Sequence, residues 1–139
     1  MGTNFDATRD YPLGTRRPDL VFTPGGLALA DVTLEALRQG RLEPADIRAT
    51  SETLLLQAEV ARAAGRAPLA ESLERAAELA TVPDDLVLAV YTALRPRRAT
   101  RGQLGEWADR LEGHGAHRTA RFVREAAEAY AERGLLADA

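Results

Sequence analysis

The sequence predicts an all-α protein: a small helical bundle of about five main helices with an extended N-terminal arm. From residue 50 onward, apolar residues recur at helical spacing in five segments, which are delimited by capping residues, Gly and Pro. No segment shows the alternating β-branched pattern of a strand. The helical faces are rich in Ala, which permits close contact between helices.

The predicted arm covers residues 1–30. Pro and Gly interrupt this segment repeatedly, and it has no sustained helical period. Side chains such as Tyr11, Leu13 and Phe22 make it too apolar for a free tail. We therefore expect it to lie along its own domain or along a partner, with residues 31–139 forming the helical domain.

Two short elements should precede the first long helix. A helix of about two turns is expected to begin at Asp31 or Thr33 on a side-chain cap and to stop at Gly40. Pro44 suits the first position of a single turn, which is expected to carry Ile47 toward the core.

The first two long helices should form an antiparallel hairpin. The first begins at Thr50 and ends at Gly65, and the second has Pro68 in its first turn. A link this short places consecutive helices side by side. The first helix is expected to have a wide apolar face, with Leu54, Ala58 and Ala61 on one stripe and Leu56, Val60 and Ala63 on a neighbouring one. The residues expected to face inward on the second helix are Leu69, Leu73, Ala76 and Ala80.

Three further helices follow. One begins at Pro83 and ends at Pro96, the next begins at Thr100 with a capping box to Gln103, and the last runs from about Ala116 to Arg133. The expected buried face of the first of these helices is formed by Leu86, Val87, Val90, Tyr91 and Leu94. That of the second is formed by Leu104, Trp107, Ala108 and Leu111. That of the last is formed by Thr119, Phe122, Val123, Ala126 and Tyr130.

The composition excludes several classes of function. The net charge is −3 and the pI about 5.4, so the chain has no general attraction to nucleic acid or to an anionic membrane. It lacks the apolar run of a secretory signal and the roughly 18 consecutive apolar residues of a spanning helix, and we expect a cytoplasmic protein. All 18 basic residues are Arg, and there is no Lys or Cys, which excludes Schiff-base and thiolate chemistry.

The residues that could carry chemistry have simpler interpretations. His114 and His117 are spaced as metal ligands could be, but no third ligand is evident, and they suit a loop and a helix start. Asp84 and Asp85 follow Pro83 and suit the positive end of a helix dipole better than an acid–base pair. We assign no catalytic, cofactor-binding or metal-binding residue to this chain.

A basic cluster extends from Arg95 to Arg101 in the string RPRRATR. A helix end followed by a new helix N-terminus could hold phosphate, but no aromatic residues lie between the arginines, and Arg is favourable near a helix C-terminus in any case. We do not expect nucleic acid as a partner. The cluster leaves one alternative function open, a stand-alone helical adaptor that binds an acidic or phosphorylated partner.

Nine strings stand in an order that resembles one enzyme family. They are DYPL, RRPDLV, TLEA, ADIR, TLLLQAEVARAAGR, ERAAEL, VPDD, YTALRP and FVREAAEAYAERG, and together they span residues 10 to 134. In this order they resemble the small, or gamma, subunit of adenosylcobalamin-dependent diol and glycerol dehydratases. Arg97, Ser51 and Arg121 depart from the residues usual in the family, which concerns the details of contacts.

The resemblance implies a lyase built as a dimer of heterotrimers, which converts propane-1,2-diol or glycerol to an aldehyde by radical dehydration. It implies that this chain is a non-catalytic subunit that docks on the large, or alpha, subunit and stabilises it. Adenosylcobalamin and a metal ion would be bound by the large and medium (beta) subunits, and none by this chain. Relatives packaged in bacterial microcompartments often carry a longer N-terminal extension; only nine residues precede Asp10, so packaging is not expected to depend on this subunit.

A docking subunit must present residues to its partners, and an apolar arm beside an Ala-rich bundle suits such a role. We expect the interface to include Tyr11, Leu13, Arg16, Arg17, Tyr91, Arg95 and Arg98.

Overall fold

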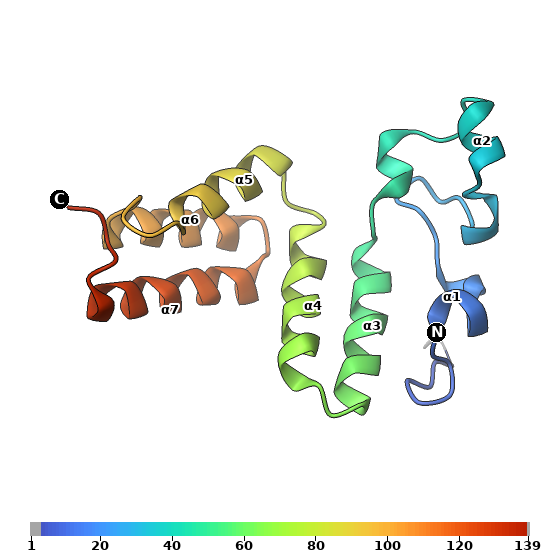
Figure 1. Ribbon diagram of the computed structural model, residues 1–139, viewed down its shortest axis with the longest axis horizontal. Coiled ribbons are helices and arrows are strands. Elements are labelled where there is room, and N and C mark those ends of the chain that lie inside the picture. The colour runs from blue at the N-terminus through green and yellow to red at the C-terminus, as the bar shows by residue number, and fades with distance from the viewer. Residues whose placement is uncertain (1–3, 139) are drawn as a thin grey trace. The chain divides into compact units, whose positions relative to one another are not determined.

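The computed structural model describes residues 4–138 of the chain (Figure 1). Within this range it contains seven α-helices, three short 3-10 helices and no strand, which confirms the all-α prediction. The chain divides into two compact units, Met1–Ala77 and Glu78–Ala139, and each is described by itself. A separate arm over residues 1–30 stays a prediction, and residues 1–3 and 139 lie outside the described range.

The N-terminal part of the first unit consists of short helical turns joined by irregular chain. Helix α1 (Leu13–Arg16) is followed by η1 (Pro18–Leu20) and η2 (Leu29–Asp31), and Phe22 and Ala28 form an isolated antiparallel bridge. Each of these elements is too short to bury a face of its own. The segment therefore depends on contacts with the rest of the unit.

Helix α2 (Leu34–Arg38) is the expected short helix. Its start is capped by Thr33, whose hydroxyl accepts a hydrogen bond from the Ala36 amide at 3.1 Å. Gly40 follows with φ of +67°, a left-handed conformation that suits Gly and ends the helix. Both predicted boundaries are confirmed.

The turn η3 (Pro44–Ile47) forms where it was expected, but Ile47 is 77% exposed, so its predicted burial is wrong. The reason lies in the polar residue beside it. The Asp46 carboxylate accepts hydrogen bonds from the Thr23 hydroxyl at 2.8 Å and from the Glu43 amide at 2.8 Å. The turn is held to the unit through Asp46, and the next side chain is left in solvent.

Helices α3 (Ser51–Ala63) and α4 (Ala67–Leu79) lie side by side and antiparallel, as predicted (Figure 1). Thr50 caps α3 by accepting a hydrogen bond from the Thr53 amide at 3.2 Å. Side-chain bonds join the helices: Ser51 Oγ donates to the Ala77 carbonyl at 2.6 Å, and Arg62 pairs with Glu74 at 2.6 Å.

The buried stripe of α4 is rotated from the predicted one. Ala70 packs with Ala58 and Ala61 of α3, and Leu73 lies partly buried against them. Leu69 is exposed, and Ala80 is exposed beyond the end of the helix, so their predicted inward positions are wrong. Adjacent helical positions differ by about 100°, and small Ala side chains let α3 approach more closely than Leu69 would allow.

The second unit is built from α5 (Asp84–Ala93), α6 (Arg101–Gly113) and α7 (His117–Arg133). Helices α6 and α7 form an antiparallel pair (Figure 1). Leu104, Leu111 and Val123 are its largest fully buried side chains. Helix α6 begins with the predicted capping box, in which Thr100 accepts a bond from the Gln103 amide at 3.2 Å and Gln103 one from the Thr100 amide at 2.9 Å.

Two aromatic residues expected in this core are exposed. Tyr91 is 61% exposed and Phe122 is 44% exposed, so the predicted burial of both is wrong. Helix α5 buries Leu86, Val90 and Ala93 instead. In a unit of three helices each helix is covered on one stripe, and an aromatic residue beside the stripe remains in solvent.

Helix α7 receives its N-terminal cap from a distant residue. Its own N-cap position, Ala116, has no side-chain hydrogen bond to offer. The carboxylate of Glu78, 40 residues earlier, accepts from the Arg118 amide at 2.9 Å. It also accepts from the Thr119 amide and hydroxyl, both at 2.9 Å. This carboxylate thereby accepts hydrogen bonds from amides that have no acceptor within the helix. Its negative charge also interacts favourably with the positive end of the helix dipole.

Candidate functional site

Four of the expected interface residues lie in the first unit. Tyr11 is 61% exposed and presents its ring, and Arg16 is exposed at the end of α1. Leu13 is buried inside the unit. Leu13 therefore anchors the turn that carries Tyr11 and Arg16. The side chains of Tyr11 and Arg16 are accessible to a partner.

Arg17 is engaged within its own chain. Its Nη1 donates to the Asp10 carboxylate at 3.1 Å and to the Asn4 carbonyl at 3.0 Å. Its Nε and Nη2 donate to Asp19 at 3.0 and 2.9 Å. The guanidinium thus ties three points of the N-terminal segment together, a use that suits its planar fork of donors.

Asp10 is the anion at the centre of this network and is 5% exposed. Hydrogen bonds from Arg9 Nε at 3.0 Å and from the Asp6 amide at 3.0 Å add to the bond from Arg17. These donors, with Arg9 first, hold the pKa of the Asp10 carboxyl well below its usual range. The carboxylate is charged at neutral pH and holds the segment around Tyr11 in place.

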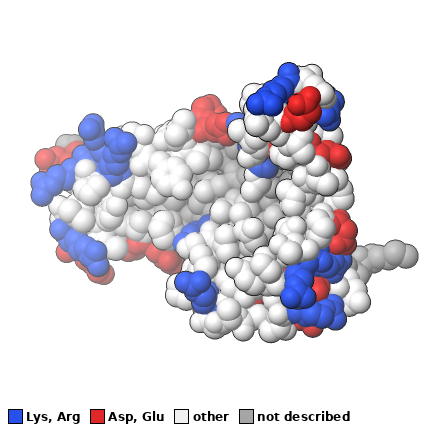
Figure 2. Space-filling view, turned by 45° about the vertical axis from the view of Figure 1, so that its right-hand side comes forward, with Lys and Arg blue, Asp and Glu red and all other residues white. Residues whose placement is uncertain are grey.

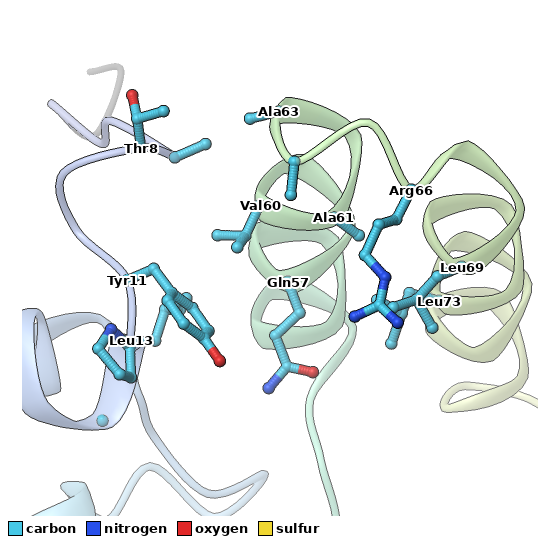
Figure 3. Close-up of a pocket in the computed structure, with 14 residues that line it drawn as sticks. Thr8, Tyr11, Leu13, Gln57, Val60, Ala61, Ala63, Arg66, Leu69 and Leu73 are labelled. Atoms are coloured by element: carbon cyan, nitrogen blue, oxygen red, sulfur yellow. The ribbon is translucent and has the colours of Figure 1, made fainter.

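A groove of about 700 Å³ lies between this segment and the α3–α4 hairpin (Figure 3). Tyr11 and Leu13 line it from the N-terminal side, and Val60 lines it from α3. Among the described residues that line the groove, Arg66 is the one with a charge. The described lining residues offer apolar contact and include no pair of groups for acid–base chemistry.

The remaining expected interface residues, Tyr91, Arg95 and Arg98, lie in the second unit and are exposed. Arg95 and Arg98 belong to the basic cluster, as does Arg101. Arg101 binds both carboxylate oxygens of Glu128, at 2.5 and 2.6 Å. Within the cluster, the charge of Arg101 is therefore neutralised by Glu128. Arg95 and Arg98 lie nearer to α5.

Sequence reasoning missed several exposed apolar side chains, of which Leu88 on α5 is the clearest at 66% exposed. A signal was present, because α5 carries the string LVLAVY and is apolar on more than one face. A helix that is apolar on more than one face needs a second surface to cover the face that its own core leaves exposed. Figure 2 shows broad areas without charged side chains between small groups of Arg, Asp and Glu. The other large exposed apolar residues include Phe22, Leu29, Leu34, Leu37, Leu55 and Leu69.

The residues weighed for chemistry lie at helix ends in the second unit. His117 Nδ1 lies 2.7 Å from Glu112 at the exposed start of α7, and His114 is the C-cap of α6. Asp84 and Asp85 occupy the first turn of α5. Over residues 4–138, no group of three or more His, Cys, Asp or Glu is arranged to hold a metal ion.

None of the helices in the described part of the chain is long and apolar enough to cross a membrane.

Comparison with known proteins gives consistent results over nearly the whole chain. The model of the family described as dehydratase small subunit matches residues 7–137. The propanediol dehydratase small subunit of Citrobacter freundii is 50% identical over 128 residues, which cover 91% of this chain and 74% of that protein. The protein of the same name from Salmonella typhimurium is 49% identical with the same coverage. The matched residues span both structural units.

Proposed function

Because the chain belongs to the family of dehydratase small subunits, we propose that it is the non-catalytic small subunit of an adenosylcobalamin-dependent diol or glycerol dehydratase. The reaction proposed for the assembled enzyme is radical dehydration of propane-1,2-diol or glycerol to the aldehyde. The observation that carries the proposal is the match over nearly the whole chain to relatives named for propanediol dehydration.

The cofactors of that reaction are assigned to the other subunits. Within residues 4–138 the donor set does not fit a metal ion, since no three potential ligands gather in one place. We assign adenosylcobalamin and the metal ion to the large and medium subunits and derive no chemical step from this chain.

The partners proposed for this chain are the large and medium subunits, assembled as a dimer of heterotrimers. Tyr and Arg are enriched where proteins meet, and this chain presents Tyr11 with Arg16 in one unit and Tyr91 with Arg95 in the other. Leu13 and Arg17 support the first of these surfaces from inside the chain. We expect the assembly in the cytoplasm, free or within a bacterial microcompartment.

The alternative of a stand-alone adaptor is not supported, because the match is to subunits of an enzyme and extends over both structural units.

The experiment is co-expression of this chain with tagged large and medium dehydratase subunits from the same source. We expect the three chains to elute together, and aldehyde formation from propane-1,2-diol or glycerol to be lost or unstable without this chain. The double variant Tyr11→Ser with Tyr91→Ser should elute separately from the others, whereas Arg121→Gln, an exposed change at a residue that belongs to neither expected surface, should not. Separate elution of the unaltered chain with undiminished activity of the other two would disprove the proposal.

A further inference from the structure

An open groove runs between α5 and α6 in the second unit, with a volume of about 490 Å³. We call it the α5 groove. Ala89, Ala93 and Ala99 line it with small side chains, and Leu88 and Trp107 line it with large apolar ones. Ala93 and Ala99 are buried parts of the unit's core, so this part of the lining is fixed by packing. The groove is shaped to receive apolar side chains.

The apolar surface continues beyond the groove along α5. Leu88 and Tyr91 lie three positions apart on the helix and are 66% and 61% exposed. Large apolar side chains that are exposed to solvent beside a groove are typical of a surface that a partner protein covers. The groove and this stripe together form one candidate surface.

Arginines gather in the loop beyond the C-terminal end of α5, beside the groove, whereas Asp84 and Asp85 lie in the first turn of that helix. Arg98 lines the groove, and Arg95 and Arg97 precede it in the same loop; all three are exposed. Among the described residues, no side-chain hydrogen bond or ion pair joins them to a carboxylate, in contrast to Arg101 with Glu128. The chain as a whole carries a net charge of −3, so the positive charge is local to this loop. A carboxylate on a partner that covers the groove would complement this local positive charge.

We propose that the α5 groove binds an apolar segment of a companion dehydratase subunit, with a carboxylate of that segment paired to Arg98. The inference rests on the proposed function and adds the surface and the chemistry of the segment that it accepts. Bidentate pairing of the guanidinium with a carboxylate fixes the segment along the groove, while its apolar side chains cover Leu88 and Tyr91. Nucleic acid is disfavoured, because a groove lined by Leu88, Trp107 and Ala side chains offers little to phosphate.

Affinity measurements test the two halves of the proposal. Leu88→Gln keeps good helix propensity and removes the apolar contact, and Arg98→Glu reverses the charge. Each should weaken binding to the co-expressed large and medium subunits by about tenfold or more. The matched controls are Leu55→Gln on α3 and Arg121→Glu on α7, both exposed and outside the groove, and these should change binding by less than about threefold.

A crosslink tests the pairing directly. The chain contains no Lys, so Arg98→Lys introduces its only side-chain amine and keeps the positive charge. In the assembled complex, a carbodiimide should join this amine to an Asp or Glu of a companion subunit, and mass spectrometry should locate the bond. Arg121→Lys, treated in the same way, should give no such bond.

The outcomes separate this inference from the proposed function. Failure of the unaltered chain to co-purify contradicts the proposed function itself. Co-purification with unchanged affinity of Leu88→Gln and Arg98→Glu, and no crosslink at position 98, overturns the groove proposal alone. Nucleic acid that co-purifies with the complex and is lost in Arg98→Glu would also overturn it.

Discussion

The carboxylate of Asp10 lies 3.1 Å from Nη1 of Arg17, seven residues further along the chain. Asp10 is almost fully shielded from solvent, and Arg17 also binds Asp19 and the Asn4 carbonyl. The pair encloses the turn that carries Tyr11 and Leu13. An N-terminal segment with little regular structure thus obtains a defined conformation from charge-assisted hydrogen bonds.

Replacement of Arg17 by Met should loosen this segment. The change removes the donors to Asp10, Asp19 and Asn4, while the apolar stem is retained. Amide hydrogen exchange should become severalfold faster for residues 6–17 and stay unchanged in the second unit. Arg16→Met is the matched control, because Arg16 is exposed and its neighbour makes the contacts. Equal exchange in the two variants would contradict the assigned role of Arg17.

Acid should weaken the same network. The pKa of Asp10 is lowered in the folded state by Arg9, the Asp6 amide and Arg17, so the folded chain binds this proton less readily than the unfolded chain. Its contribution to the free energy of unfolding is complete above the ordinary pKa of 3.8 and is lost as the pH falls below that value. Asp46, whose pKa is lowered by the Glu43 amide and the Thr23 hydroxyl, acts with the same sign.

Urea titrations at neutral pH and at several values below the ordinary Asp pKa measure this effect. Asp10→Asn should be less stable than the unaltered chain at neutral pH, and the difference should shrink as acid is added. If the difference in the free energy of unfolding between Asp10→Asn and the unaltered chain were the same at all pH values, Asp10 would not be the group responsible.

Loss of the Glu78 carboxylate should destabilise the second unit through the start of α7. Glu78→Ala leaves the Arg118 and Thr119 amides without their acceptor and should lower the free energy of unfolding by about 1–2 kcal/mol, the usual cost of a lost N-cap. Thermal unfolding followed by circular dichroism measures the change. Glu71→Ala, an exposed change on the same helix, should cost less than about 0.5 kcal/mol.

Arg97 adopts a left-handed conformation with φ of +61° in the loop between α5 and α6. A side chain with a Cβ atom is strained there by about 1 kcal/mol, whereas Gly is not. Arg97→Gly should therefore be more stable than Arg97→Ala by about 1 kcal/mol, since both lose the same charge. Chemical denaturation of the two variants gives the comparison, and equal stability would show that the loop relaxes to accommodate either residue.

The sequence predicted the helices well where their ends carry local signals. Thr33, Thr50 and Thr100 each cap a helix as expected, and Gly40 and Gly134 stop helices in the left-handed conformation. A cap or a stop depends on residues within one turn of it, so a single sequence is sufficient to place it. The expected interface residues stay a prediction, and the structure adds that Leu13 is buried and Arg17 is hydrogen-bonded within the chain, whereas Tyr11 and Tyr91 are exposed.

Burial was predicted less well. Ile47, Tyr91 and Phe122 have helical spacing suited to a core and lie exposed, because the period of a helix gives the relative directions of its side chains but not how wide a stripe its neighbours cover. Leu88 was overlooked for the same reason. Periodicity alone cannot distinguish an apolar side chain that faces the chain's own core from one that faces outward.

The sequence by itself therefore determined the helical class, the helix boundaries and the family, because these depend on local capping signals and on the order of residues along the chain. The tertiary structure alone decided which side chains face solvent, and it brought Glu78 to the start of α7, 40 residues further along the chain. These are relationships between elements that lie apart in the sequence. They arise from how helices pack on one another, which no single segment specifies.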